Sequence, residues 1–202
     1  MEKLQAALEK AREKRSGTSP QSNRLRTPGR TPASVPADVE ALWENIPRLN
    51  IEPKKLKRKR LVALEGGSEA TPFDVLRTKV LQILEANDWH RVAITSPSPG
   101  SGKTTTSANL AIALARQVDL RITLMDMDMR RPALAKAIGY KEEISVSSVL
   151  EGEAEFGTQA RRIGKNLALS MNYTSSRDPS DLFLRQRTSD IIHAIEARYR
   201  PD

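Results

Sequence analysis

The stretch VAITSPSPGSGKTTTSANLAIALA, residues 92–115, predicts a strand, a glycine-bearing loop and a helix in direct succession. Its first apolar run is short enough for a buried strand, and its Ala/Leu-rich end has the packing face of a helix. The loop between them contains Gly100, Gly102, Lys103 and Thr104. Together the three parts indicate a phosphate-binding loop.

A loop of the pattern G-x-x-x-x-G-K-[ST] binds phosphate through its inward-pointing backbone N–H groups, and its lysine reaches the outer phosphates. The helix that follows adds a partial positive charge at its N-terminus. Pro97 stands at the position of the first glycine, so the pattern is imperfect. A strand–turn–helix with a chance GSGK is the alternative. The residues predicted to bind the nucleotide are Pro99, Gly100, Ser101, Gly102, Lys103, Thr104 and Thr105.

A pair of acids follows the next predicted strand, in LMDMDMRRP, residues 124–132. Alternation along a strand would put Asp126 and Asp128 on one side of it, and ligands of open α/β sheets bind at the carboxyl ends of the strands. A Mg²⁺–nucleotide complex would neutralise two carboxylates there. The alternative is a surface turn in which the acids pair with Arg130 and Arg131.

Strand-like and helical patterns alternate along the rest of the chain, which predicts an α/β fold with a mostly parallel sheet covered on both faces. The strands are expected at 91–96, 121–130 and 166–172. The helical segments are expected at 71–88, 102–117, 131–139, 145–152 and 178–199. The first of these helices has its large apolar residues on one face, namely Phe73, Leu76, Val80, Leu81 and Leu84.

The N-terminal part has a different composition. We expect a short amphipathic helix over residues 1–15, a flexible, basic Pro/Ser-rich arm over 16–60, and a P-loop nucleotide-binding domain over 61–202. Residues 1–60 contain 15 Lys and Arg against 7 Asp and Glu, and the remaining 142 residues contain 18 of each. The basic charge is therefore concentrated before the domain.

The run PKKLKRKR places six basic residues among the seven from Lys54 to Arg60. A solvated approach to the domain is one interpretation, and docking on an anionic membrane surface is another. Nucleic acid is the least favoured partner, because the domain itself is neutral.

Several classes are excluded by composition. There is no cysteine, so neither a disulfide framework nor a thiolate metal site can form. No apolar run approaches the roughly 20 residues of a membrane span, and the N-terminus lacks the apolar region of a secretory signal. We expect a soluble, cytoplasmic chain that could lie peripherally at the inner face of the plasma membrane.

The loop and the acid pair together resemble one family. ITSPSPGSGKTTTSANLAIALA followed by ITLMDMDMRRPAL is similar to the bacterial tyrosine kinases of polysaccharide synthesis, the CpsD/CapB-type family. SVSSVLEG and DPSDLF also resemble stretches of these proteins, so the similarity covers roughly residues 62–200. It implies the three-layer P-loop NTPase fold that these kinases share with MinD- and ParA-like ATPases.

The resemblance also implies roles for individual residues, with ATP and Mg²⁺ as cofactors. Lys103 and Thr104 would bind phosphate and Mg²⁺. Asp126 and Asp128 would be the acids of the D-x-D-x-R motif called Walker A′, which bind metal and activate the incoming tyrosine hydroxyl. The implied catalytic residues are Lys103, Asp126 and Asp128, and the implied metal ligands are Thr104, Asp126 and Asp128. Ser98 stands where MinD- and ParA-like relatives have a lysine, which favours the kinase branch.

The chain departs from the family pattern at its C-terminal end. The Walker B strand, an apolar run ending in D-x-P-P, would follow a stretch like YRPD, and this sequence stops there at Asp202. We therefore expect the C-terminal strands of the sheet to be missing. The tyrosine-rich tail of the family is also missing, and Tyr140, Tyr173 and Tyr199 lie far apart in the sequence.

Two further departures concern partners. The helix before the loop carries an E-x-x-R-x-x-R pattern in the family, used for ring assembly and subunit contacts. Here only Arg77 matches, because Thr71 and Asp74 stand at the other two positions. Arg77 is thus the candidate for a subunit contact in a homo-oligomer. The activator of the family would have to be a separate protein, a membrane-anchored polysaccharide chain-length or export protein.

The leading hypothesis is an ATP-binding, tyrosine-kinase-like P-loop protein that regulates exopolysaccharide or capsule synthesis or export. A second is a MinD- or ParA-like ATPase switch that binds membrane or DNA. A third is a non-catalytic nucleotide-binding scaffold. Phosphoryl transfer needs positioning and charge stabilisation more than covalent chemistry, so the phosphate-binding loop and its acids carry the hypothesis.

Overall fold

The computed structural model describes residues 37–141, 145–175 and 179–202. The helix expected over residues 1–15 and the first part of the expected arm lie outside the described residues. The elements, in chain order, are α2 (Ala37–Asn45), α3 (Pro53–Arg58), α4 (Thr71–Asn87), α5 (Lys103–Ala115), β1 (Ile122–Met125), α6 (Leu134–Ile138), α7 (Val146–Leu150), α8 (Phe156–Gln159), β2 (Arg161–Ile163), β3 (Leu167–Ser170), α9 (Pro179–Leu184) and α10 (Gln186–Tyr199).

The strands form one mixed sheet in the order β1-β3-β2. β1 and β3 are parallel, with Ile122 opposite Leu167 and Met125 opposite Ser170. β2 pairs with β3 in the antiparallel direction. Because β1 and β3 are parallel, the residues that follow both strands emerge at the same end of the sheet. That end is where the sequence places its acid pair.

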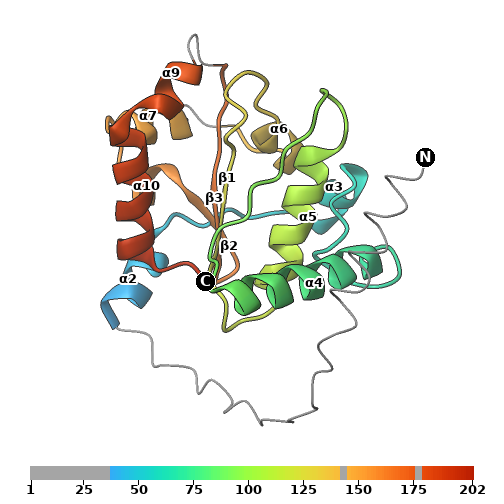
Figure 1. Cartoon of the computed structure of the whole chain (residues 1–202). Helices are drawn as coiled ribbons and strands as arrows, with labels where there is room; N and C mark the ends of the chain where they lie inside the picture. Colours follow the sequence, from blue (N-terminus) through green and yellow to red (C-terminus); the bar gives the residue numbers. More distant parts are fainter. Residues whose placement is uncertain (1–36, 142–144, 176–178) are drawn as a thin grey trace, which may run out of the picture. The chain divides into compact units, whose positions relative to one another are not determined.

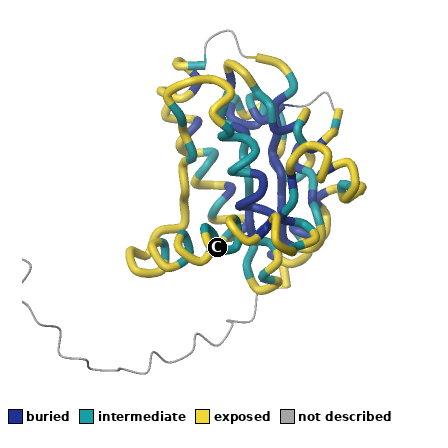
Figure 2. The backbone as a smooth tube through the Cα atoms, turned by 90° about the vertical axis from the view of Figure 1, so that its right-hand side faces the viewer, coloured by how far each residue is buried: buried dark blue, intermediate teal, exposed yellow. Residues whose placement is uncertain are grey.

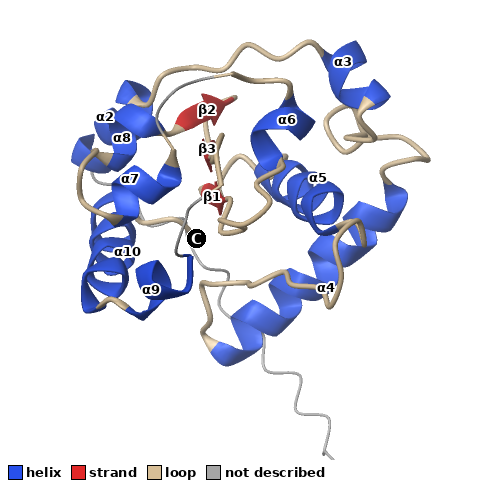
Figure 3. Cartoon of the chain, turned by 90° about the horizontal axis from the view of Figure 1, so that it is seen from above, coloured by secondary structure: helices blue, strands red, loops and turns tan. Residues whose placement is uncertain are grey.

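Helices cover both faces of the sheet (Figures 1 and 3). α2, α7, α8, α9 and α10 lie on one side, and α3, α4, α5 and α6 lie on the other. The three-layer α/β class predicted from the sequence is therefore confirmed.

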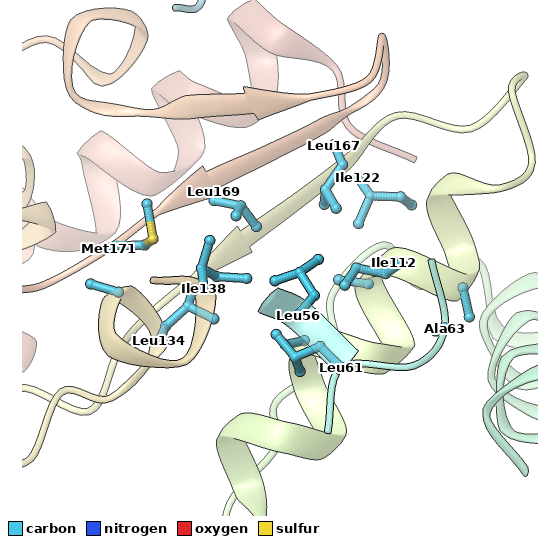
Figure 4. Packing of buried hydrophobic residues seen from close by; sticks show 14 residues of the cluster. Leu56, Leu61, Ala63, Ile112, Ile122, Leu134, Ile138, Leu167, Leu169 and Met171 are labelled. Atoms are coloured by element: carbon cyan, nitrogen blue, oxygen red, sulfur yellow. The ribbon is translucent and has the colours of Figure 1, made fainter. Parts of the chain in front are cut away.

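The main hydrophobic core lies between the sheet and the layer that contains α5 (Figure 4). Leu56 and Leu61, each 1% exposed, pack here with Ile112 of α5 and Leu167 of β3. Burial of a leucine side chain contributes roughly 1.5–3 kcal/mol. The segment that contains Leu56 and Leu61 is thus part of the domain.

A second core lies on the opposite face of the sheet. Trp43 of α2 is 3% exposed and packs in the same cluster as Ile195 and Tyr199 of α10. Its indole N–H donates a hydrogen bond of 2.7 Å to the carbonyl oxygen of Tyr199, so the polar end of this large side chain is satisfied.

The described part of the expected flexible arm is folded, which corrects the predicted boundary at residue 61. Residues 37–60 contribute α2, α3 and several core residues. The high local charge suggested an arm, but α3 turns Leu56 inward and leaves its lysines exposed. In a short amphipathic helix of this kind, one apolar residue makes the contact with the core while the charged residues face solvent.

The strand predicted over residues 91–96 is not formed, and this prediction is wrong. No residue of the segment lies in a strand, and Val92 is 49% exposed. Figure 2 shows that buried residues gather in the middle of the domain and that exposed residues lie on its outside. Its apolar composition fits a strand, but a strand also needs a neighbour for its N–H and C=O groups. Among the described residues no strand pairs with it.

Three other elements differ from the predictions. The helix expected over 178–199 is two helices, α9 and α10, because Arg185 takes an extended conformation with ψ of 132°. The short elements α8 and β2 were not predicted. α4 forms as expected, and its predicted apolar face is only half-buried: none of its residues is fully buried.

Candidate nucleotide-binding site

The loop before α5 turns sharply at two glycines. Gly100 and Gly102 have φ of +77° and +92°, values that favour glycine over residues with a Cβ. Within the loop, the hydroxyls of Ser96 and Ser101 both donate to the carbonyl oxygen of Ser98 at 3.0 Å. α5 then begins at Lys103, so its N-terminal N–H groups lie at the end of the loop.

Lys103 contacts the acid motif directly. Its ammonium group lies 3.2 Å from the Asp128 carboxylate, with both side chains about one-third exposed (28% and 33%). Figure 1 shows the loop before α5 and the segment after β1 on the same side of the molecule. The fold therefore brings together two motifs that are separated by more than twenty residues in the sequence.

Asp128 is held in its ionised form. One of its carboxylate oxygens accepts a hydrogen bond of 3.0 Å from the Arg131 N–H. Partial burial alone would raise the pKa of Asp128, but this hydrogen bond and Lys103 together lower the pKa below its ordinary value. The carboxylate is therefore available as an anion at neutral pH.

Asp126 has a different environment. It is 9% exposed and accepts hydrogen bonds of 3.1–3.2 Å from the N–H groups of Asp128, Ala133 and Leu134. Burial raises the pKa of Asp126, and these backbone hydrogen bonds partly offset that effect. Asp126 therefore fixes the path of the chain between β1 and α6.

The predicted placement of both acids on one side of a strand is wrong. β1 ends at Met125, so the alternation of side chains along a strand does not extend to Asp126 and Asp128. Asp126 accepts hydrogen bonds from the backbone, whereas Asp128 pairs with Lys103. The prediction that the acids follow the carboxyl end of a strand is confirmed, but only Ile122 of the four residues of β1 is fully buried.

The donor set fits Mg²⁺ bound together with a nucleotide better than a metal held by protein alone. Within the described ranges no group of three or more His, Asp or Glu side chains is placed to hold a metal ion. Mg²⁺ commonly uses one or two carboxylates together with phosphate oxygens and water. Asp128 and the Thr104 hydroxyl could supply that small number of ligands.

Asn172 is a site residue that the sequence reasoning missed. It is 1% exposed and lies two residues after β3. Its amide donates a hydrogen bond of 2.7 Å to the carbonyl oxygen of Asp126, and its side-chain oxygen accepts one from Ser147 N–H. A polar residue immediately after the buried run LALSM was the available signal.

Asn109 supports the loop helix from behind. It is fully buried in α5, and its side-chain oxygen accepts hydrogen bonds from Val62 N–H at 2.8 Å and Ala63 N–H at 3.0 Å. Its amide donates to the carbonyl oxygens of Arg60 and Thr105, both at 2.9 Å. A single asparagine on the Ala/Leu face of the predicted helix was the signal for this role.

Arg77, the candidate for a subunit contact, lies between α4 and α5. Its guanidinium donates to the Ala113 carbonyl oxygen at 3.1 Å and lies 3.3 Å from Asp74. Asp74 also pairs with Arg116 at 2.9 Å. These contacts attach α4 to α5 within one chain, and a role in subunit assembly stays a prediction.

The fold brings two of the dispersed tyrosines together. The rings of Tyr140 and Tyr173 have centroids 6.3 Å apart, and Arg161 donates a hydrogen bond to the Tyr140 hydroxyl. Burial raises the pKa of Tyr173 to about 12, so its hydroxyl stays protonated at neutral pH. Tyr199 is buried in the other core and is 4% exposed.

In the parts of the chain that the structure describes, no helix combines the length and the apolar character needed to cross a bilayer.

Sequence comparison matches residues 92–201, more than half of the chain, to the CobQ/CobB/MinD/ParA nucleotide binding domain. Among curated proteins, the tyrosine-protein kinase wzc of Salmonella typhimurium is 27% identical over 149 residues, which cover 72% of this chain and 21% of that protein. The tyrosine-protein kinase ptk of Acinetobacter johnsonii is 25% identical and is likewise covered to 21% of its length. The chain thus spans about a fifth of these relatives.

Solved structures give the same relationship. The kinase domain of the Escherichia coli tyrosine kinase ETK has a TM-score of 0.61 and 25% identity, covering 70% of this chain and 56% of that domain. The kinase domain of VpsO has a TM-score of 0.55 and 28% identity, covering 65% of this chain and 66% of that domain. Both solved structures are of kinase domains.

Proposed function

Because the chain belongs to the CobQ/CobB/MinD/ParA nucleotide-binding domain family, and its relatives include bacterial tyrosine kinases, we propose that it binds Mg·ATP and takes part in tyrosine phosphorylation. The observation that carries the proposal is the 3.2 Å contact between Lys103 and Asp128, which joins the loop to the acid motif. A cation at a helix N-terminus beside a carboxylate suits a phosphate and its magnesium ion.

The proposed roles follow from the contacts. The loop from Pro99 to Thr105 would bind the phosphates, with Lys103 reaching the outer ones. A bound phosphate would compete with Asp128 for Lys103, which would release the carboxylate for the metal ion or for the incoming hydroxyl. Thr104 would supply a second oxygen to Mg²⁺. Asp126, hydrogen-bonded to the backbone of Ala133 and Leu134, would position the motif and approach the metal through its remaining acceptor capacity.

The wider role is proposed from the relatives and from the resemblance of the two motifs. The protein would regulate exopolysaccharide or capsule synthesis or export at the inner face of the plasma membrane. Its activator would be a membrane-anchored polysaccharide chain-length or export protein. Contacts with other copies of the chain would involve the α4 region around Arg77. The exposed basic residues of α3 and its neighbours, 54–60, would face anionic lipid.

The nucleotide site is tested by measuring Mg·ATP affinity by calorimetry for the unaltered chain, Lys103→Met and Lys136→Met. Lys136 is an exposed lysine of α6 and controls for the loss of one charge. We expect Lys103→Met to lose at least about tenfold in affinity, as expected for one charge-assisted contact to phosphate. Equal affinities for the three proteins would contradict the assignment.

The reaction is tested by the products. The chain is incubated with Mg·ATP and a random Glu/Tyr copolymer, and phosphotyrosine and free phosphate are measured. Lys103-dependent phosphotyrosine supports the kinase. Free phosphate without phosphotyrosine supports an ATPase switch, and binding without either product supports a non-catalytic scaffold.

A further inference from the structure

A polar pocket lies away from the nucleotide site, at the other end of the sheet. It has a volume of about 310 Å³ and is lined by Arg48, Leu49, Asn50, Arg162, Gly164 and Lys165. The volume is at the lower end of the range of small-ligand sites, which begins at about 300 Å³.

The strand register separates this pocket from the loop. Ile163 pairs with Leu167, the first residue of β3, whereas the acid motif follows the end of β1 that lies beside Ser170. Four residues of a strand span roughly 10 Å. The pocket and the nucleotide site are therefore at opposite ends of the same central strand.

The pocket lies where two chain segments, the one after α2 and strand β2, are joined by backbone hydrogen bonds. Arg162 N–H donates to the carbonyl oxygen of Pro47, and Leu49 N–H donates to the carbonyl oxygen of Arg162, both at 2.8 Å. These bonds attach the segment after α2 to the free edge of β2. The backbone around the pocket is thereby fixed on both sides.

Arg162 brings a buried positive charge to this junction. It is 3% exposed and donates to the carbonyl oxygens of Gly164 at 2.8 Å and Glu44 at 3.3 Å. Its Nε atom is buried and has no hydrogen-bond partner. A buried guanidinium whose hydrogen bonds go only to neutral carbonyls is energetically costly, because these dipoles replace its hydration incompletely.

The other cations add to the same positive potential. Arg48 and Lys165 are both exposed on the pocket wall. None of Arg48, Arg162 and Lys165 forms an ion pair with a carboxylate of the described ranges. Burial lowers the pKa of Arg162, the charge of Arg48 lowers it further, and Glu44 partly compensates. Two guanidinium groups therefore repel each other across the pocket.

We propose that the pocket of Arg48, Arg162 and Lys165 binds a phosphate group, either free or as the phosphate of a small ester. A dianion there would accept hydrogen bonds from Arg48 and Lys165 and relieve the repulsion between Arg48 and Arg162. Guanidinium groups match the geometry of phosphate oxygens, and the charge of a buried cation such as Arg162 is less screened by water than that of an exposed one. The site differs from the P-loop in using side chains rather than a helix N-terminus.

The test follows backbone amide signals by NMR while inorganic phosphate, and separately glucose 1-phosphate, is titrated into the full chain. The signals of Leu49, Gly164 and Lys165 report this pocket, and those of Gly100 and Gly102 report the P-loop. We expect the pocket signals to shift and saturate. Their affinity for the ligand should differ from the affinity that the P-loop signals report. Saturation by phosphate alone identifies the free anion, and tighter saturation by glucose 1-phosphate identifies an ester.

Variants separate the pocket from general charge effects. The double variant Arg48→Gln, Lys165→Gln keeps the buried Arg162 and should weaken binding at the pocket by about tenfold or more, without changing the shifts at Gly102. Lys79→Gln, at an exposed lysine of α4, controls for lost charge and should have no effect. The proposal is overturned if the pocket signals do not saturate, or if the double variant binds as tightly as the unaltered chain.

Discussion

At the scale of single residues, Asn109 shows how the nucleotide loop is anchored. Four backbone groups depend on its side chain, two as donors and two as acceptors. They come from the segment 60–63 and from α5 itself. The loop helix is thus attached through one buried amide to a segment that lies 46 to 49 residues before Asn109 in the chain.

Asn109→Ala should therefore destabilise the protein strongly. It leaves the N–H groups of Val62 and Ala63 buried without acceptors, and each such loss costs about 1–3 kcal/mol. Urea denaturation should show a decrease of about 2–4 kcal/mol in the free energy of unfolding. The control Asn87→Ala, at an exposed position, should change it by less than about 0.5 kcal/mol. A similar small effect for both variants would contradict the anchoring role.

The lowered pKa of Asp128 predicts how the stability of the protein depends on pH. Because its folded-state pKa is lowered, its charge contributes stability above the ordinary carboxyl pKa of about 3.9, and this contribution is lost as pH falls through the folded-state value. Asp128→Asn keeps an oxygen for the Arg131 N–H but removes the charge. At pH 7 the variant should be less stable by about 0.2–1 kcal/mol, as for other partly exposed ion pairs.

The measurement is urea denaturation of both proteins between pH 7 and pH 3. The difference between them should shrink as the solution becomes more acidic, since the unaltered Asp128 is then progressively protonated. Asp126→Asn is not an equivalent change, because burial raises the pKa of that residue and the sign of its pH dependence is opposite. A difference that grows on acidification would contradict the assignment for Asp128.

At the scale of elements, α3 determines where the domain begins. Six basic residues surround Leu56, and the helix has Pro53 at its first turn. Lys55 and Lys57 pair with Glu52 and Glu69, both at 2.6 Å. The element is therefore charged on its outer surface and attached to the core by a single leucine.

Leu56→Ala tests whether the attachment matters. Removing a fully buried leucine side chain should cost about 2–5 kcal/mol, depending on how far the core relaxes. The matched control is Leu184→Ala in α9, where the same atoms are removed from a residue that is 84% exposed. Its effect should be within about 0.5 kcal/mol. Chemical denaturation measures both, and equal costs would show that α3 does not belong to the core.

At the scale of the whole molecule, charge is distributed unevenly while the family fold is preserved. The net charge of +8 comes from residues 1–60, and the rest of the chain is neutral. Part of that excess lies on the surface of α3, next to the nucleotide-binding layer. We therefore expect an anionic membrane surface to contact the domain at α3.

Vesicles of phosphatidylcholine with phosphatidylserine test this orientation. Replacing Lys54, Arg58 and Lys59 with glutamine should weaken vesicle binding roughly a hundredfold, at about 1 kcal/mol for each basic residue. Added salt should steeply weaken vesicle binding by the unaltered chain. The control replaces Lys79, Lys136 and Lys141, which removes the same charge elsewhere. Equal losses in both triple variants would indicate a general charge effect and contradict docking through α3.

Local pattern was sufficient to predict much of this molecule. The sequence predicts the three-layer class, the loop before α5 and the acids after a strand, because glycine spacing and hydrophobic periodicity act over a few residues. The same local reasoning failed for residues 91–96 and for the acid pair. A strand needs a partner along its edge, and alternation ends where the strand ends.

The sequence by itself determined that a lysine at a helix N-terminus and an acid pair after a strand would be present. Only the tertiary structure decided that Lys103 meets Asp128 while Asp126 is committed to the backbone. It also decided that Leu56 belongs to the core and that Arg48 and Arg162 share a pocket. These outcomes depend on packing between distant segments, and the free energy of burial and of charge pairing is fixed only when those segments meet.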